Sequence, residues 1–257
     1  MYGLVQAARQ FYKKFIEAMT STKMHFEKCL ADGCLLKRKN EHGILIVCVY
    51  VDDTMCIGTR EAIDEFKNEL KEVFNTKDEG KMEEYVGCSV IRKDNGKLMM
   101  HHPHLLRKIK REFEEELEKV RIYDTPASTG DTVIRAKDGD DKAIFLEPAK
   151  QRRYRSGVGM LLYLVKFTRP DISNSVRELS KAMDKSTDAH YKALLRVLKY
   201  VVRTENLGLV YDSGILMNFN GTWQIVAFCD SDFAGDKDNR ISVTGFCVYI
   251  GKCLIGQ

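Results

Sequence analysis

Hydrophobic positions in the first part of the chain follow a helical period and then a strand-like one. Residues 4–19 carry large apolar side chains at helical intervals, at Leu4, Phe11, Phe15 and Met19. Residues 35–36 and the uninterrupted apolar run 44–50 predict two strands, joined by a hairpin loop over residues 39–43. The second run is rich in β-branched residues, which is typical of a strand buried on both faces.

Two adjacent carboxylates, Asp52 and Asp53, interrupt this apolar run, which resumes over residues 54–58. The pattern therefore predicts a strand, an acidic turn and a second strand. Thr59 is expected to cap the helix that follows, because threonine is favoured at helix N-caps. The apolar face of that helix comprises Ala62, Ile63, Phe66, Leu70, Val73 and Phe74.

The middle of the chain predicts a hairpin, a helix and a linker. Residues 85–92 and 97–101 have strand character and flank a tight turn at residues 94–96. Residues 103–120 are helical in pattern and highly charged. The irregular stretch 124–147 contains a proline and two glycines, so it is the best candidate for a linker.

The rest of the chain predicts three helices and then strands. The helices lie within residues 152–204, and their apolar positions are Leu161, Leu162, Leu164, Ile172, Val176, Leu179, Leu194, Leu195 and Leu198. The predicted strands cover residues 207–211, 224–229 and 243–250, and a polar turn is expected at residues 236–239.

Composition narrows the class of protein. With 257 residues, of which 44% are hydrophobic and 30% charged, the chain is typical of a globular protein that buries a core. It has neither an apolar run near the roughly 18 residues that span a bilayer nor a secretory signal, so we expect no membrane partner. Its eight cysteines lack zinc-knuckle spacing and indicate a reducing compartment without disulfides.

Charge permits nucleic-acid binding without requiring it, because the net charge is +4 and the pI about 8.5. Three short cationic clusters stand out: residues 37–39, residues 107–111, and the arginines Arg152, Arg153 and Arg155. Each cluster is either a solvated face or a phosphate contact, and charge alone leaves both interpretations open.

The acidic turn is the strongest candidate for chemistry. Asp52 and Asp53 bring like charges together at the end of an apolar strand, which is unfavourable unless a cation neutralises them. Mg²⁺ with oxygen ligands is the usual cation at phosphoryl-transfer sites. A two-metal site needs a further carboxylate from another strand. The alternative is a plain hairpin turn, in which aspartate is a favoured residue.

Six blocks of sequence, in this order, resemble one family. They are MYGLVQAARQFY, ILIVCVYVDDTMCIGT, TKDEGKMEEYVGCSVIR, YRSGVGMLLYLVKFTRPDISNSV, HYKALLRVLKYVVRTENLGLVY and FCDSDFAGDKDNRISVTGFCVYIG. Together they cover nearly the whole chain. They resemble the reverse transcriptases, RNA-directed DNA polymerases with ribonuclease H, of copia-type LTR retrotransposons.

The resemblance implies an α+β fold assembled from parts of three domains. Residues 1–102 would form a partial right-hand polymerase palm, an antiparallel sheet plus helices with the catalytic turn and a primer-grip hairpin. Residues 103–205, with the linker 124–147, would form a helical thumb and connection. Residues 206–257 would be the truncated β-hairpin start of a ribonuclease H-like domain.

The resemblance also implies roles for individual residues. Asp52 and Asp53 would be catalytic ligands of Mg²⁺, with Mn²⁺ as an alternative. Tyr50 and Val51 would lie near the primer terminus, and Gln6 beside the incoming nucleotide and the template base.

Further implied roles concern the nucleic acid. The primer-grip hairpin would include Tyr85, Val86 and Gly87. The thumb would hold the duplex through its backbone, with phosphate contacts from Arg152, Arg153 and Arg155. Asp230 matches the first catalytic, metal-binding carboxylate of the ribonuclease H domain, whereas Asp232 and Asp236 are interpreted as turn residues.

The implied partners are an RNA template, a DNA primer and their hybrid, and, in the parent polyprotein, an integrase and an N-terminal polymerase portion. The family works in cytoplasmic particles and delivers DNA to the nucleus. The further palm aspartate and the other ribonuclease H carboxylates are expected outside this sequence, so we expect the isolated chain to lack both activities. The alternatives are a non-catalytic nucleic-acid-binding module and a decayed or co-opted retroelement relic.

Overall fold

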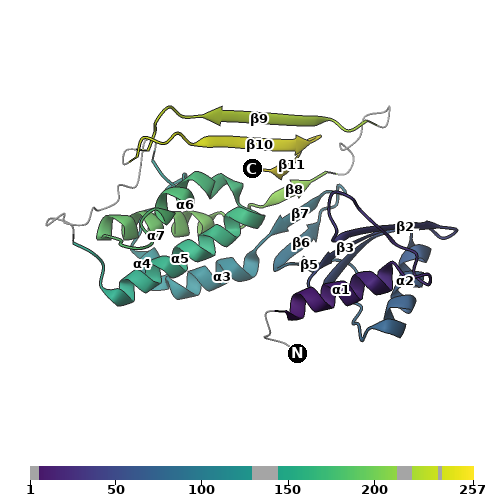
Figure 1. Cartoon of the computed structure of the whole chain (residues 1–257). Coiled ribbons are helices and arrows are strands. Elements are labelled where there is room, and N and C mark those ends of the chain that lie inside the picture. Colours follow the sequence, from purple (N-terminus) through teal and green to yellow (C-terminus); the bar gives the residue numbers. More distant parts are fainter. Residues whose placement is uncertain (1–5, 129–143, 213–221, 237–238) are drawn as a thin grey trace. The chain divides into compact units, whose positions relative to one another are not determined.

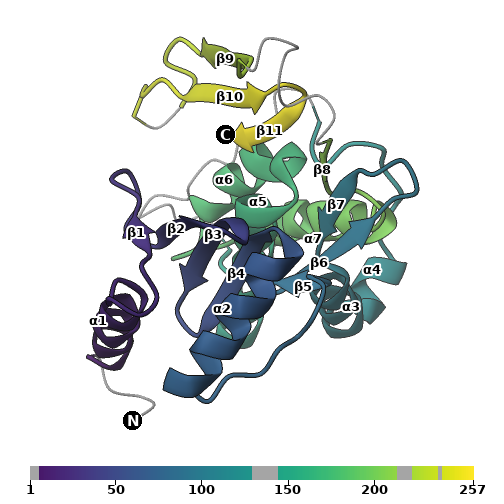
Figure 2. The same cartoon turned by 90° about the vertical axis from the view of Figure 1, so that its right-hand side faces the viewer.

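The computed structural model describes residues 6–128, 144–212, 222–236 and 239–257. The chain divides into two compact units, Met1–Met82 and Glu83–Gln257. Figures 1 and 2 show that each unit combines helices with strands, and every strand pair in the described residues is antiparallel. This mixed architecture with antiparallel sheets agrees with the predicted α+β class.

The first unit is one four-stranded sheet with two helices. The sheet has the order β1-β2-β3-β4, formed by Glu27–Lys28, Leu35–Asn40, Gly43–Tyr50 and Asp53–Gly58. The helices are α1 (Ala7–Met19) and α2 (Arg60–Val73). Apolar side chains of both helices join those of β2 and β3 in one core, which includes Phe15, Met19, Leu36, Val47 and Phe66. Both helices therefore cover the same face of the sheet.

The prediction that the second strand is buried on both faces is wrong. Along β3, Leu45, Val47 and Val49 are buried, but Ile44 and Ile46 are 53% and 39% exposed. The strand alternates because the helices cover one face of the sheet. We call the face that carries Ile44 and Ile46 the open face.

Two local details of the first unit also differ from the prediction. The loop between β2 and β3 is only Glu41-His42, because β2 continues to Asn40 and pairs there with Gly43. Thr59 does precede α2, as predicted. Its hydroxyl donates to the carbonyl of His42 instead of capping the helix.

The second unit contains a four-stranded sheet of order β5-β6-β7-β8. Its strands are Glu84–Tyr85, Cys88–Arg92, Leu98–His101 and Leu209–Tyr211. The predicted continuous strand 85–92 is wrong, because a two-residue turn at Val86-Gly87 divides it into β5 and β6. Pairing of β8 with β7 joins residues more than 100 positions apart in the chain.

The helices of the second unit share one apolar core. They are α3 (Pro103–Glu112), α4 (Glu114–Glu118), α5 (Pro148–Phe167), α6 (Ser173–Ser180) and α7 (Asp188–Arg203), with a 3-10 turn at Pro170–Ile172. The predicted helix 103–120 is thus interrupted at Phe113. The three predicted helices of residues 152–204 are confirmed, but Leu162, expected in the core, is 43% exposed. None of the helices described is long and apolar enough to cross a membrane.

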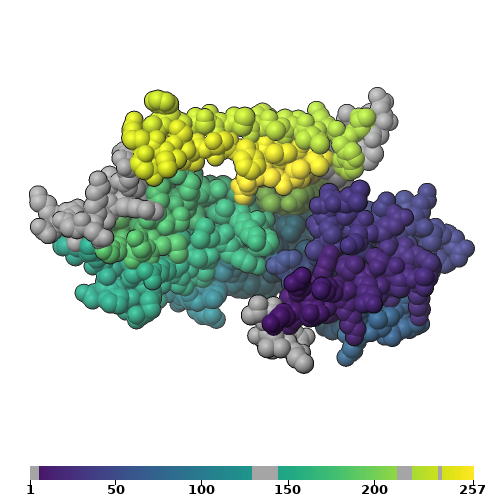
Figure 3. Space-filling model, in the orientation of Figure 1, coloured from purple at the N-terminus to yellow at the C-terminus, as the bar shows by residue number. Residues whose placement is uncertain are grey.

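A three-stranded sheet of order β11-β10-β9 completes the second unit. Its strands are Ile225–Ser231 (β9), Thr244–Ile250 (β10) and Cys253–Gly256 (β11). Figure 3 shows residues of β9 and β10 at the surface, where Phe228 and Phe246 are exposed. Most of the predicted linker, residues 129–143, and residues 237–238 of the predicted polar turn lie outside the described residues. The predicted domain boundaries stay predictions.

Candidate functional site

A two-residue turn, Val51-Asp52, joins β3 to β4 at the acidic motif. Tyr50 pairs with Asp53, so the ladder runs to the edge of the turn. Val51 has a φ of +52°, a left-handed backbone angle that residues other than glycine and asparagine rarely adopt. A β-branched residue in this region costs about 1–2 kcal/mol relative to ordinary backbone. The chain thus holds a strained residue beside its two carboxylates.

Both carboxylates of the turn are exposed. Asp53 is the cross-strand partner of Tyr50, and Tyr50 alternates with the buried Val49, so Asp53 lies on the open face. Adjacent, accessible carboxylate oxygens are suitable ligands for a hard divalent cation. Within the described residues, no group of three histidine, cysteine, aspartate or glutamate side chains could hold a metal ion. The turn therefore brings together two exposed carboxylates, without a third possible ligand among the described residues.

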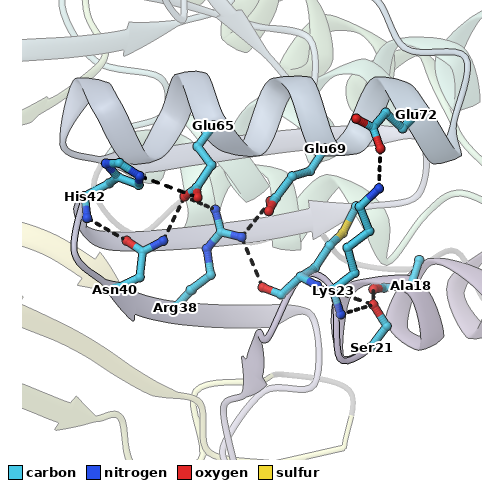
Figure 4. Close-up of polar contacts among 10 residues, drawn as sticks. Ala18, Ser21, Lys23, Arg38, Asn40, His42, Glu65, Glu69 and Glu72 are labelled. Carbon is cyan, nitrogen blue, oxygen red and sulfur yellow. Dashed lines mark hydrogen bonds and ion pairs between the residues drawn. The ribbon is translucent and has the colours of Figure 1, made fainter.

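A buried ion network fixes the strand next to this hairpin (Figure 4). Arg38 of β2 is 6% exposed, and its guanidinium lies 2.9 Å from Glu65 and 2.6 Å from Glu69 of α2. It also donates to the carbonyl of Met24 and stacks on the ring of Phe26 at 4.7 Å. Paired, hydrogen-bonded charge is the condition under which a buried arginine is tolerated.

This network corrects the interpretation of the first cationic cluster. Both readings of residues 37–39, a solvated face or a phosphate contact, required an exposed Arg38, and both are wrong for that residue. Lys37 and Lys39 alternate with it and are exposed. Two features of the sequence could have indicated that Arg38 is buried. Side chains alternate between the faces of a strand, and the two glutamates lie four residues apart on one face of α2, where both can reach the same partner.

The second candidate region is the turn between β5 and β6. Val86 and Gly87 have φ values of +49° and +72°, and two positive φ values define a type I′ hairpin turn. The hydroxyl of Tyr163 on α5 donates to the Val86 carbonyl at 3.1 Å. A Cβ atom at Gly87 would lie in tight contact, 3.1 Å, with that hydroxyl, and the positive φ of this residue favours glycine. Tyr85 is half-buried at the end of β5.

A surface groove extends from this turn along α5. Near the turn it is lined by Gly87, His102, His104, Leu105, Lys108, Ser156, Gly159, Met160 and Tyr163. Ser156 also lines a second hollow, whose charged residues are the cations Lys119, Lys150, Arg152, Arg153 and Lys192 and the carboxylates Glu112, Glu116 and Asp188. Arg152, Ser156, Gly159 and Tyr163 share one face of α5 and span about 17 Å at 1.5 Å per residue. We call this surface the α3–α5 groove. Sequence reasoning missed it because its two walls are far apart in the chain.

The three predicted phosphate-contacting arginines have different environments. Arg152 is exposed and makes no hydrogen bond or ion pair with another described residue. Arg153 pairs with Glu116 at 2.7 Å and stacks on Phe113, whereas Arg155 donates to the carbonyls of Met183 and Asp184. Arg152 is therefore the freest of the three to meet a ligand.

The remaining predicted residues lie apart from these regions in the chain. Gln6 is exposed and precedes α1. Asp230 is exposed on β9, in the second unit, and accepts a hydrogen bond from the amide of Ser231. Asp232 accepts from the amide of Val243, and Asp236 pairs with Lys181 at 2.8 Å. The contact of Asp232 lies within its own hairpin, whereas Lys181 lies at the end of α6, and the interpretation of both aspartates as turn residues stays a prediction.

Comparison with known proteins identifies the class of protein. Residues 1–126 match the family model described as reverse transcriptase (RNA-dependent DNA polymerase). The first half of the chain matches this family, and the predicted resemblance to the reverse transcriptases of copia-type retrotransposons is confirmed.

Its relatives include transposon polyproteins. The chain is 29% identical over 250 residues to the retrovirus-related Pol polyprotein from transposon TNT 1-94 of Nicotiana tabacum, with 96% of this chain covered. It is 29% identical over 252 residues to that from transposon RE1 of Arabidopsis thaliana, with 98% covered. It spans 18% and 16% of their lengths. It also matches a Ty5-1 transposon protein of Saccharomyces cerevisiae, at 26% identity over 96% of this chain and 75% of that protein. No solved structure matches.

Proposed function

We propose that this chain supplies part of the polymerase site of an RNA-directed DNA polymerase, with Asp52 and Asp53 as ligands of Mg²⁺ or Mn²⁺. The observation that carries the proposal is the turn itself, in which two exposed carboxylates adjoin Val51 at a φ of +52°. Strain of this kind persists where surrounding structure imposes it, and such positions cluster at active sites.

The chemistry of the turn suits this role. Divalent ions at such a site stabilise the attacking and the leaving oxygen during nucleotidyl transfer. Asp52 at the tip and Asp53 on the open face would hold the ions from one side, and a carboxylate from another strand would complete the set. Tyr50 and Val51 are exposed beside them and would face the primer terminus. Gln6 would contribute to the pocket for the nucleotide and template.

The finer assignment of parts is also a proposal. The sheet of the first unit would be part of the polymerase palm, and helices α5, α6 and α7 would be the thumb. The sheet of β9, β10 and β11 would begin a ribonuclease H-like domain, with Asp230 as its first metal ligand.

The α3–α5 groove would hold the backbone of the template–primer. Gly87 and Gly159 have no side chains and Ser156 has a small one, so a sugar–phosphate chain could approach closely. Lys108 near the turn and Arg152 at the far end supply positive charge, and both are exposed. Contacts to phosphates are independent of base sequence, as copying any template requires. Arg153 and Arg155 would support the helices instead.

Primer extension tests the role of the acidic turn. This chain would be joined to the polymerase segment that precedes the matching region in the tobacco relative, and extension of oligo(dT) on poly(rA) measured with Mg²⁺. We expect Asp52→Asn to reduce extension to background. Asp64→Asn on α2, which removes an equally exposed carboxylate of the same unit, should leave it unchanged. Equal extension by the two variants would refute the proposal.

Binding of a labelled RNA–DNA hybrid by the 257-residue chain tests the groove. We expect Lys108→Gln and Arg152→Gln each to lower the slope of log Kd against log salt by about one. Lys71→Gln, at an exposed lysine of the first unit, is the control and should not change it. Slopes identical to that of the unmodified chain would exclude the groove as the binding surface.

A further inference from the structure

A buried chain of polar groups lies beneath the α3–α5 groove. His102, which precedes α3, is only 2% exposed. Its Nδ1 lies 2.8 Å from Oγ1 of Thr168, and its Nε2 lies 3.2 Å from Sγ of Cys88. Thr168 and Cys88 are buried as well. The imidazole therefore bridges the start of β6 and the residue that follows α5.

The partners of this imidazole are neutral. They are a hydroxyl, a thiol and the rings of Tyr163 and Phe167, whose centroids lie 5.2 and 5.8 Å from that of His102. Burial lowers the pKa of His102, with a further contribution from His101, and burial raises the pKa of the Cys88 thiol to about 11. At neutral pH the ring is neutral, so one nitrogen donates and the other accepts. Both nitrogens have partners, as a buried polar network requires.

Two routes lead from this network to the Val86-Gly87 turn. Cys88 directly follows the turn, and its Sγ lies 3.9 Å from the Val86 carbonyl. Tyr163 packs edge-on against the His102 ring and donates its hydroxyl to the same carbonyl. The network thus reaches the turn both along β6 and across from α5.

We infer that His102 is a positioning residue that holds the Val86-Gly87 turn at the end of the α3–α5 groove so that it can meet a nucleic-acid backbone. This inference rests on the proposed function, because the position of the turn matters for binding only if the groove holds a nucleic-acid backbone. His102 lies at the floor of the groove with only 2% of its surface exposed, so it would act through Cys88, Thr168 and Tyr163.

The alternative is an ordinary core histidine that contributes to stability alone. The two roles differ in what a small change does to binding. Loss of a positioning contact weakens affinity for the hybrid without removing a phosphate contact, so the salt slope stays constant. Loss of a purely structural contact lowers the melting temperature and leaves the affinity of the folded chain unchanged.

The experiment measures hybrid affinity, salt slope and thermal stability of the full 257-residue chain. Tyr163→Phe removes the hydroxyl bonded to Val86, and Thr168→Val removes the partner of His102 Nδ1 at nearly constant volume. We expect each to weaken hybrid binding about 3- to 10-fold, the size of one lost hydrogen bond. In the double variant the losses should be less than additive, because the two groups act through one network.

Tyr154→Phe is the matched control. It lies on the same helix, and its buried hydroxyl likewise donates to a carbonyl, that of Leu179 at 2.7 Å. We expect it to lower stability but not affinity. A second comparison uses variants of the network itself. We expect Cys88→Ser to bind the hybrid better than Cys88→Ala, and His102→Gln better than His102→Leu, because serine and glutamine keep a hydrogen-bonding group. With two such pairs, the comparison remains possible if one variant folds poorly.

The outcomes separate the two proposals. If the unmodified chain binds hybrid and the Tyr163 and Thr168 variants bind equally well, the positioning role is refuted while the proposed function stands. If the unmodified chain does not bind hybrid, the proposed nucleic-acid groove fails, and the role of His102 fails with it.

Discussion

Tyr50 and Asp53 face each other as the last residue pair of the β3–β4 hairpin, which leaves only Val51 and Asp52 for the turn. Because cross-strand partners share a face of the sheet, Asp53 emerges beside Tyr50 on the open face, while Asp52 occupies the tip. A register shift of one residue would turn Asp53 toward the core. The spacing of the two carboxylates therefore depends on the ladder as much as on the motif.

Val51 is expected to limit the stability of the first unit. Replacing it by asparagine, which tolerates a positive φ, should raise the free energy of unfolding by about 1 kcal/mol. Urea denaturation measures the change. The control is Val210→Asn in strand β8. It should lower the free energy of unfolding, because β-branched residues favour strands. A decrease on Val51→Asn would show that the turn is not strained.

Arg38 is predicted to be essential to the first unit. Arg38→Met leaves Glu65 and Glu69 without their shared cation, so the free energy of unfolding should fall by about 3–5 kcal/mol. Lys37→Met, one residue away in an exposed pair with Glu27, should cost less than about 1 kcal/mol. Similar losses for the two variants in urea denaturation would contradict the assignment of Arg38 as a buried network residue.

Gly159 gives a prediction in which stability and binding change in opposite directions. A methyl group there would meet no described atom within 4 Å, so Gly159→Ala should stabilise α5 by about 0.5–1 kcal/mol. The same methyl would intrude on the α3–α5 groove and weaken hybrid binding. Gly157→Ala is the contrast on the same helix. Its methyl would lie 2.9 Å from Leu194 and 3.2 Å from Phe113, so it should lower the melting temperature. A Gly159→Ala chain that binds hybrid normally would argue against the groove.

The second unit should lose stability in mild acid. Burial lowers the pKa values of His101 and His102 below the ordinary 6.5. Just below pH 6.5 the unfolded chain therefore binds more protons than the folded chain. The contribution of these two neutral histidines to the free energy of unfolding is complete above pH 6.5. It is lost as the pH falls from 6.5 to their lowered pKa values in the folded chain. Urea denaturation between pH 8 and 5 should show this fall, and His102→Gln should flatten it.

Much of the local structure could be predicted because it follows from periodicity. The helix of residues 60–73, the hairpin around Asp52 and the three helices after residue 147 each have a sequence pattern that matches their secondary structure. The failures share a cause. The turn at Val86-Gly87 and the break at Phe113 lie within continuous strand or helix patterns, and each is contacted by a residue distant in the chain, Tyr163 and Arg153 respectively.

The candidate site divides in the same way. Asp52 and Asp53 could be found from the chain alone, because two carboxylates after an apolar strand are unusual and the motif belongs to a known family. The different environments of Arg152, Arg153 and Arg155 could not be predicted from the chain, because neighbouring residues of a helix point toward different parts of the structure. The buried state of Arg38 was missed because its glutamate partners lie on another element.

The sequence by itself determined the family, the acidic turn and the positions of most helices and strands, since these depend on local order and motif identity. Tertiary structure alone decided which face of β3 is covered, which arginine is free, and that His102 joins the end of α5 to the Val86-Gly87 turn. Those features arise when separate helices and strands come into contact, and for His102 the partners Thr168 and Tyr163 lie more than 60 residues away in the chain. Contacts of that range depend on packing and leave no periodic trace in the chain.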